Sequence, residues 1–60
     1  MIETTLKLGL FKGHPRRLTR VTLLNRTLYR VYHYTEGEWA LGLETGVYGK
    51  AICTLYSLGA

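Results

Sequence analysis

Hydrophobic and polar residues alternate along most of this chain of 60 residues. The period of two is typical of β-strands. Residues 2–10 place Ile and Leu on one side and Glu, Thr, Lys and Gly on the other, which predicts a strand with one buried face. Gly13-His14-Pro15 is expected to end it, because Pro lacks a backbone donor and Gly permits unusual backbone angles.

The same pattern predicts three further strands. They are expected at residues 18–24, 27–35 and 39–44. The middle segment is rich in β-branched and aromatic side chains, and the last one alternates large residues with small ones, as in a tightly curved strand. Asn25-Arg26 and Glu36-Gly37 are the expected turns, since Asn and Gly tolerate a left-handed backbone.

The pattern over residues 50–58 fits two elements. A strand would turn Ala51, Cys53 and Leu55 inward, whereas a helix would align Ala51, Leu55 and Leu58. The poor helix formers in this segment favour the strand. We therefore expect a single all-β domain over residues 1–60, either a small five-stranded curled antiparallel sheet or an SH3-like barrel, with a short C-terminal helix as the alternative.

Loop length decides which residues of the third strand are inside. Two-residue turns would bury Arg30, and three-residue loops would instead bury Tyr29, Val31 and His33. Burying an unpaired charge costs several kcal/mol, which is more than the preference for a two-residue turn. We therefore expect the second register, with three-residue loops, in which Trp39 is also on the inner face. The outer face would then carry Arg20, Thr22, Arg30, Tyr32 and Tyr34.

Charge is distributed unevenly along the sequence. Residues 1–30 hold seven Lys or Arg and one Glu, and residues 31–60 hold one Lys and three Glu. A basic surface of this kind suits an anionic partner. Arg in particular offers a fork for phosphates, and Tyr offers a ring for stacking bases. The predicted binding residues are Lys12, Arg16, Arg17, Arg20, Arg26, Arg30, Tyr32 and Tyr34.

The candidates for catalysis and metal binding are few. Cys53 is the single cysteine, and its apolar neighbours favour an inert buried thiol rather than a nucleophile paired with His14 or His33. These three residues also lack the spacing of metal ligands. We therefore expect a protein that is not an enzyme and needs no cofactor or metal. A lone cysteine and the absence of about 20 consecutive apolar residues favour a cytoplasmic protein without a membrane span.

Two functions remain. The first is a module that binds DNA or RNA through phosphate contacts. The alternative is a small regulator or inhibitor, of the kind a phage or plasmid encodes, that docks on an acidic protein surface through its charged face. Exposed strand edges would also allow a homodimer.

Overall fold

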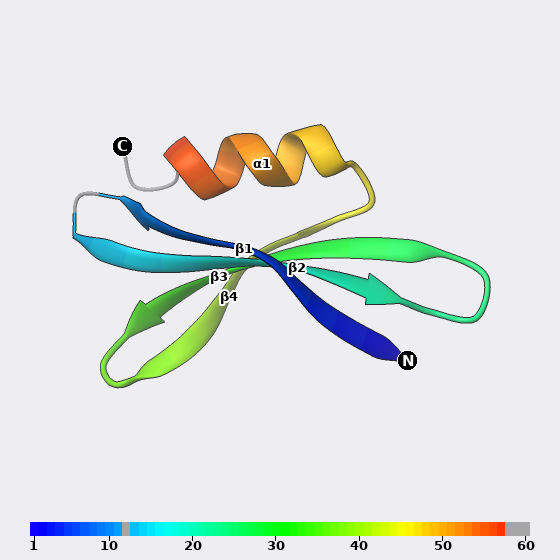
Figure 1. The fold of residues 1–60 in the computed structure, drawn as a ribbon, viewed down its shortest axis with the longest axis horizontal. Helices are drawn as coiled ribbons and strands as arrows, with labels where there is room; N and C mark the ends of the chain where they lie inside the picture. The colour runs from blue at the N-terminus through cyan, green and yellow to red at the C-terminus, as the bar shows by residue number, and fades with distance from the viewer. Residues whose placement is uncertain (12, 58–60) are drawn as a thin grey trace.

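The computed structural model describes residues 1–11 and 13–57, which form four strands and one helix (Figure 1). The elements are β1 (Ile2–Phe11), β2 (His14–Thr22), β3 (Thr27–Thr35), β4 (Glu38–Thr45) and α1 (Tyr48–Ser57). Consecutive strands pair antiparallel in the order β1-β2-β3-β4, and α1 lies along one side of the twisted sheet (Figure 1). No described helix is long and apolar enough to cross a membrane.

Two features of the expected fold are corrected. The described sheet has four strands rather than five, and it is not closed into a barrel, so β1 and β4 are its edges. The C-terminal segment is the helix α1 rather than the favoured strand, and residues 58–60 lie outside the described chain. Burial explains the helix, because Ala51 and Leu55, one turn apart, are 0% and 1% exposed against Leu18 and Val31.

The core lies between α1 and the sheet. Leu18, Val31, Ala51 and Leu55 are its buried members, with partly buried hydrophobic side chains around them. These neighbours are Leu6, Tyr29, Leu43 and Ile52. We call this side of the sheet the helix face and the opposite side, which α1 does not cover, the open face.

The register between β2 and β3 differs from the expected one. Val21 pairs with Leu28 and Thr22 with Thr27, so four residues connect these strands, and the Leu23 backbone N–H donates to the Arg26 carbonyl at 2.8 Å. An even loop length puts Arg30 opposite Thr19 on the open face and leaves Val31 on the helix face. The expected pairing register is therefore wrong, but the expected faces of β3 are confirmed, with Tyr29, Val31 and His33 on the helix face and Arg30, Tyr32 and Tyr34 on the open face.

β3 and β4 connect through a two-residue turn at Glu36-Gly37 rather than the three-residue loop of the chosen register, and a bulge then changes the faces of β4. Glu36 and Gly37 both have positive φ, at 52° and 84°. Tyr34 pairs with Trp39 and Tyr32 with Leu41, but the register shifts by one residue before Val31 meets Leu43. The extra residue is Gly42. Trp39 thus lies on the open face and Leu43 on the helix face, so the expectation that they share one inner face is wrong.

Candidate binding surface on the open face of the sheet

The open face carries a band of exposed apolar side chains across all four strands. Leu8, Arg17, Tyr32 and Leu41 are successive cross-strand partners and form one row of this band. Leu8 is 72% exposed and Leu41 is 52% exposed. The next row includes Leu10 of β1, which is 73% exposed. Leu8 and Leu10 thus lie on the β1 edge and Leu41 on the β4 edge, and Tyr32 and Arg17 connect them. A continuous exposed apolar band marks a contact surface more often than leucines scattered singly.

Aromatic rings surround Arg17 in the middle of the band. The Arg17 Cζ atom lies 5.1 Å from the centroid of the Tyr32 ring and 5.0 Å from that of Trp39. The Trp39 ring in turn meets Tyr34 edge-to-face, with centroids 5.2 Å apart. A guanidinium over ring faces is held by the ring quadrupoles, so these contacts fix where Arg17 lies on the surface.

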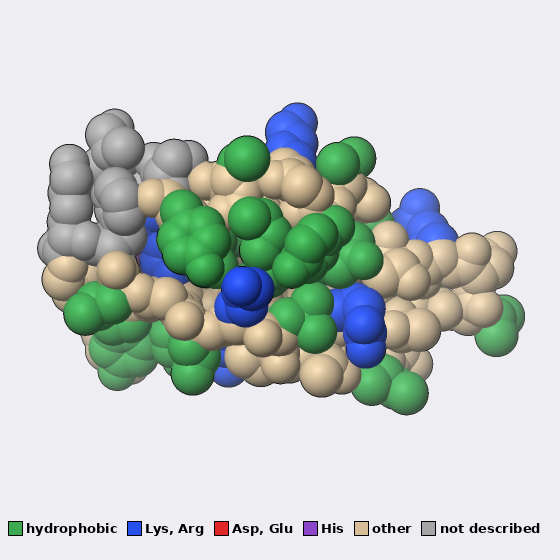
Figure 2. Space-filling view, turned by 45° about the horizontal axis from the view of Figure 1, so that its top comes forward, with side chains coloured by type: hydrophobic (Ala, Val, Ile, Leu, Met, Phe, Trp, Pro, Cys, Tyr) green, Lys and Arg blue, Asp and Glu red, His purple; other side chains and the backbone are tan. Residues whose placement is uncertain are grey.

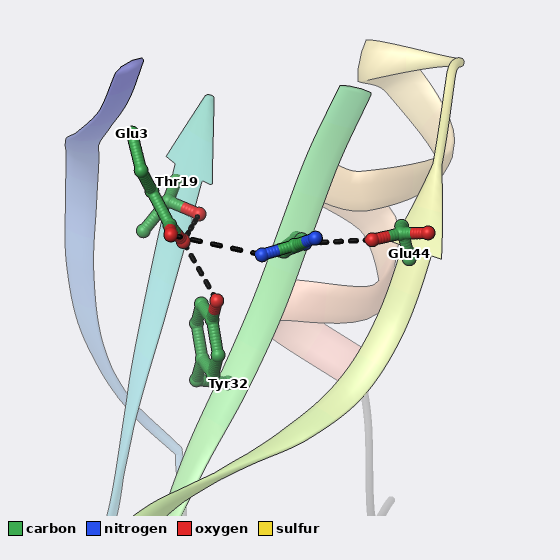
Figure 3. Close-up of polar contacts among 5 residues, drawn as sticks. Glu3, Thr19, Tyr32 and Glu44 are labelled. Carbon is green, nitrogen blue, oxygen red and sulfur yellow. Dashed lines mark hydrogen bonds and ion pairs between the residues drawn. The ribbon is translucent and has the colours of Figure 1, made fainter. Parts of the chain in front are cut away.

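A polar cluster occupies the end of the open face beyond Arg17. The Glu3 carboxylate accepts hydrogen bonds from the hydroxyls of Thr19, at 2.8 Å, and Tyr32, at 2.6 Å (Figure 3). Arg30 lies between two carboxylates, with Nε 2.6 Å from Glu44 and Nη1 3.7 Å from Glu3. The two carboxylates described on the open face, those of Glu3 and Glu44, are therefore bound by residues of the same chain.

These contacts shift the ionisation of the cluster. The hydrogen bond from Tyr32, followed by that from Thr19, lowers the pKa of Glu3 below its ordinary value. The hydrogen bond to Glu44 raises the pKa of the Arg30 guanidinium. The charge of Arg30 was the reason for expecting it outside the core, and the structure confirms this, because Arg30 lies on the open face with its charge paired to two carboxylates.

The predicted binding residues divide between the two faces. Arg17, Arg30, Tyr32 and Tyr34 are on the open face, as their pairing shows. Arg16 pairs with His33 and Arg20 with Tyr29, which puts both arginines on the helix face. The expected grouping of Arg20 with Arg30 and the tyrosines is therefore wrong. The remaining two predicted residues are Arg26, which is exposed in the β2–β3 loop, and Lys12, which lies outside the described residues.

The side of the molecule that bears α1 is basic. In the view from this side, Lys and Arg side chains lie around a central group of hydrophobic ones, and no Asp or Glu comes into sight (Figure 2). Arg20 is exposed on this face. Two acidic residues belong to the open-face cluster, and Glu36 and Glu38 are at the β3–β4 turn. The uneven charge along the sequence therefore corresponds to a basic side that bears α1, with the acidic residues on the open face and at the β3–β4 turn.

A cleft of about 490 Å³ is lined by residues of β2, β3 and β4. Its lining consists of His14, Arg16, His33, Tyr34, Thr35, Leu41 and Gly42. Arg16 is 5% exposed, and its Nη1 donates to the carbonyl of Leu55 at 3.5 Å. Arg16 thus contacts the last turn of α1, a position that suits a cation because helix carbonyls end there. Nothing in the sequence pattern marks this role.

The part of the chain that the structure describes contains no group of three or more His, Cys, Asp or Glu side chains that could hold a metal ion. Cys53 is exposed on α1, so the expectation of a buried thiol is wrong. The candidate contact residues that the sequence pattern does not identify are Leu8, Leu10, Trp39 and Leu41. Their alternation predicts burial, whereas α1 leaves the open face on which they lie uncovered.

Comparison of the chain with protein-family models, with curated proteins and with solved structures found no match.

Proposed function

We propose that this protein is a small regulator or inhibitor that docks on another protein through the open face of its sheet. The observation that carries the proposal is the band of exposed leucines around Arg17, on a face whose two carboxylates are already bound by Arg30, Thr19 and Tyr32. Leu side chains gain free energy when they leave water, at roughly 25 cal/mol per Å² of apolar surface. The partner should therefore present apolar side chains to this band.

The residue types in the band support docking on a protein. Trp, Tyr and Arg are the side chains that most often carry the binding energy of protein interfaces. Tyr32 and Trp39 both contact Arg17, so little side-chain freedom remains to be lost when a partner binds. Aliphatic leucines, by contrast, add nothing to base stacking, which uses aromatic faces.

The test compares the open face with an equally exposed leucine elsewhere. Leu24 is fully exposed in the β2–β3 loop, away from the band, so Leu24→Glu is the matched control for Leu8→Glu and Leu41→Glu. Proteins captured by the immobilised chain are identified, purified and titrated against each variant. We expect Leu8→Glu and Leu41→Glu to lose the partner and Leu24→Glu to keep it.

Two results would contradict the proposal. One is a partner that binds Leu8→Glu as tightly as the wild type. The other is a wild-type chain that forms dimers in light scattering while Leu8→Glu is a monomer, because the open face would then belong to a second copy. A dimer that survives Leu8→Glu would point to the free edges of β1 and β4 instead.

A second candidate function, nucleic-acid binding, is favoured by the basic side that bears α1 (Figure 2). Phosphate contacts there would involve Arg20 rather than the open face. The two candidates use opposite sides of one sheet, so single substitutions separate them.

A further inference from the structure

Arg17 differs from the other open-face arginine in what it contacts. Arg30 binds two carboxylates. Arg17 is in contact with two aromatic rings, and within the described chain it forms no hydrogen bond or ion pair. Its Nε atom is buried without a hydrogen-bond partner among the described residues. A guanidinium carries five N–H donors, and those of the two Nη atoms are the ones that Arg17 can offer to a partner from a fixed place.

The surroundings of Arg17 decide which acceptor suits these donors. Its cross-strand neighbours are Leu8 and Tyr32, and Leu41 follows in the same row. A carboxylate accepts two parallel N–H bonds from a guanidinium, and the apolar stem of an Asp or Glu side chain can lie against leucines. A nucleic-acid backbone would instead bring successive hydrated phosphates over an apolar band that holds no second unpaired cation.

We propose that Arg17, held by Tyr32 and Trp39, binds the carboxylate of an Asp or Glu side chain that stands among apolar residues on the partner protein. This inference rests on the proposed docking function and names the chemistry of its partner. The leucines supply the apolar contact. Arg17 supplies the specificity, because a partner without the carboxylate would leave a buried donor unsatisfied.

Short random peptides displayed on phage serve as the probe. They are selected on the immobilised wild-type chain, and the chosen peptides are titrated with fluorescence detection. Trp39 is the only tryptophan and lies beside Arg17, so its emission reports on occupancy of the site. The variants are Arg17→Gln, Arg17→Lys and Lys50→Gln, the last being an exposed control on α1. Thermal melting by circular dichroism verifies that each variant is folded.

We expect the selected peptides to share an Asp or Glu flanked by apolar residues. Replacing that residue by Asn or Gln should weaken binding at least about tenfold, as should Arg17→Gln, and the two changes together should cost little more than either alone. Arg17→Lys keeps the charge but loses the two parallel donors of the guanidinium. Its affinity for the peptides should therefore lie between that of the wild type and that of Arg17→Gln. Lys50→Gln should bind like the wild type.

The possible failures point to different steps. Selected peptides that lack an acidic residue, or that bind Arg17→Gln as well as the wild type, would contradict the role of Arg17. If the same peptides fail to bind Leu8→Glu, the docking function would still be supported. Peptides that bind Leu8→Glu unchanged, or no selected peptide at all, would overturn the docking function and this inference with it. Binding of an oligonucleotide that depends on Arg17 would assign the guanidinium to phosphate instead.

Discussion

Trp39 and Leu18 are both large hydrophobic residues, but their surroundings differ. Leu18 is fully buried between the sheet and α1, whereas Trp39 is half-buried on the open face and contacts Tyr34 and Arg17. The sequence pattern alone predicts that Trp39→Ala would cost on the order of 3–5 kcal/mol, as for a core aromatic residue. Because the ring lies on an uncovered face, we expect a smaller loss of unfolding free energy in Trp39→Ala.

Trp39→Ala should therefore lower the free energy of unfolding by only about 1–2 kcal/mol, the scale of exposed aromatic and cation–π contacts. Leu18→Ala should cost about 2–5 kcal/mol, because it opens a cavity in the core. Urea denaturation followed by circular dichroism measures both. A larger loss for Trp39→Ala than for Leu18→Ala would show that Trp39 belongs to the core after all.

Glu3 gives the stability a dependence on pH. Hydrogen bonds from Tyr32 and Thr19 lower the pKa of its carboxyl in the folded chain below the ordinary value of 4.5. A lowered folded pKa stabilises the fold above the unfolded pKa, and this contribution is lost as pH falls through the folded pKa. We expect the melting temperature of the wild type to fall more steeply below about pH 4.5 than that of Glu3→Gln.

The other acidic residues titrate in both proteins, so the difference between the two pH profiles isolates Glu3. Glu36→Gln is the matched control, because Glu36 is exposed in a turn and no described hydrogen bond or ion pair involves it. Its profile should follow that of the wild type. Parallel profiles for wild type and Glu3→Gln would contradict the assigned hydrogen bonds.

Arg30 shows which part of a residue's environment the sequence predicts. Its neighbours along the chain predict a strand, and its charge predicts a position outside the core, and the structure confirms both. Its two carboxylate partners, Glu3 and Glu44, are 27 residues before it and 14 residues after it. Alternation along one strand contains no information on such distant partners, so the sequence pattern does not predict the ion pairs of Arg30.

Elements were predicted best where local signals agree. The third strand was expected at residues 27–35 and β3 is Thr27–Thr35, because β-branched and aromatic residues fill it between two turns. β2 begins at His14 rather than at residue 18, since Pro15 is tolerated as the second residue of the strand. The strand favoured over residues 50–58 is wrong and the helix kept as its alternative is α1, because packing of Ala51 and Leu55 on the sheet outweighs local propensity.

The turn between β3 and β4 contains a residue, Glu36, whose backbone conformation is unfavourable. Both of its residues have positive φ, which corresponds to the mirror-image turn that favours Asn-Gly, and the first position is occupied by Glu36 at a φ of 52°. A left-handed backbone costs a residue with a normal side chain about 1–2 kcal/mol, and Asn less. Glu36→Asn should therefore raise the free energy of unfolding by about 0.5–1 kcal/mol.

Urea denaturation measures this gain, and Gly37→Ala is the opposing control. An added Cβ at Gly37 would meet no atom within 4 Å, so any loss of stability in Gly37→Ala reports backbone strain at its φ of 84° rather than a clash. Equal stability of Glu36→Asn and wild type would mean that the turn relaxes to accommodate Glu36.

In the folded chain, basic residues that are close together in the sequence lie on opposite faces of the sheet. Seven basic residues lie in the first half of the chain, but the even register between β2 and β3 sends Arg17 and Arg30 to one face and Arg16 and Arg20 to the other. The sequence therefore predicted a basic chain correctly and a single basic face incorrectly. Face assignment depends on loop length, and the four-residue connection after Thr22 carries no turn motif that fixes it.

This separation makes the nucleic-acid candidate testable residue by residue. If DNA or RNA binds the side that bears α1, Arg20→Gln should weaken binding across sequences and reduce the slope of log affinity against log salt by about one unit. Arg17→Gln should leave that slope unchanged, because Arg17 is on the opposite face. Fluorescence anisotropy with labelled single- and double-stranded oligonucleotides at several salt concentrations measures both. A slope that responds to Arg17 and not to Arg20 would move the phosphate contacts to the open face. No binding at low salt would remove nucleic acid as a partner and leave docking on a protein, which the exposed leucines of the open face support.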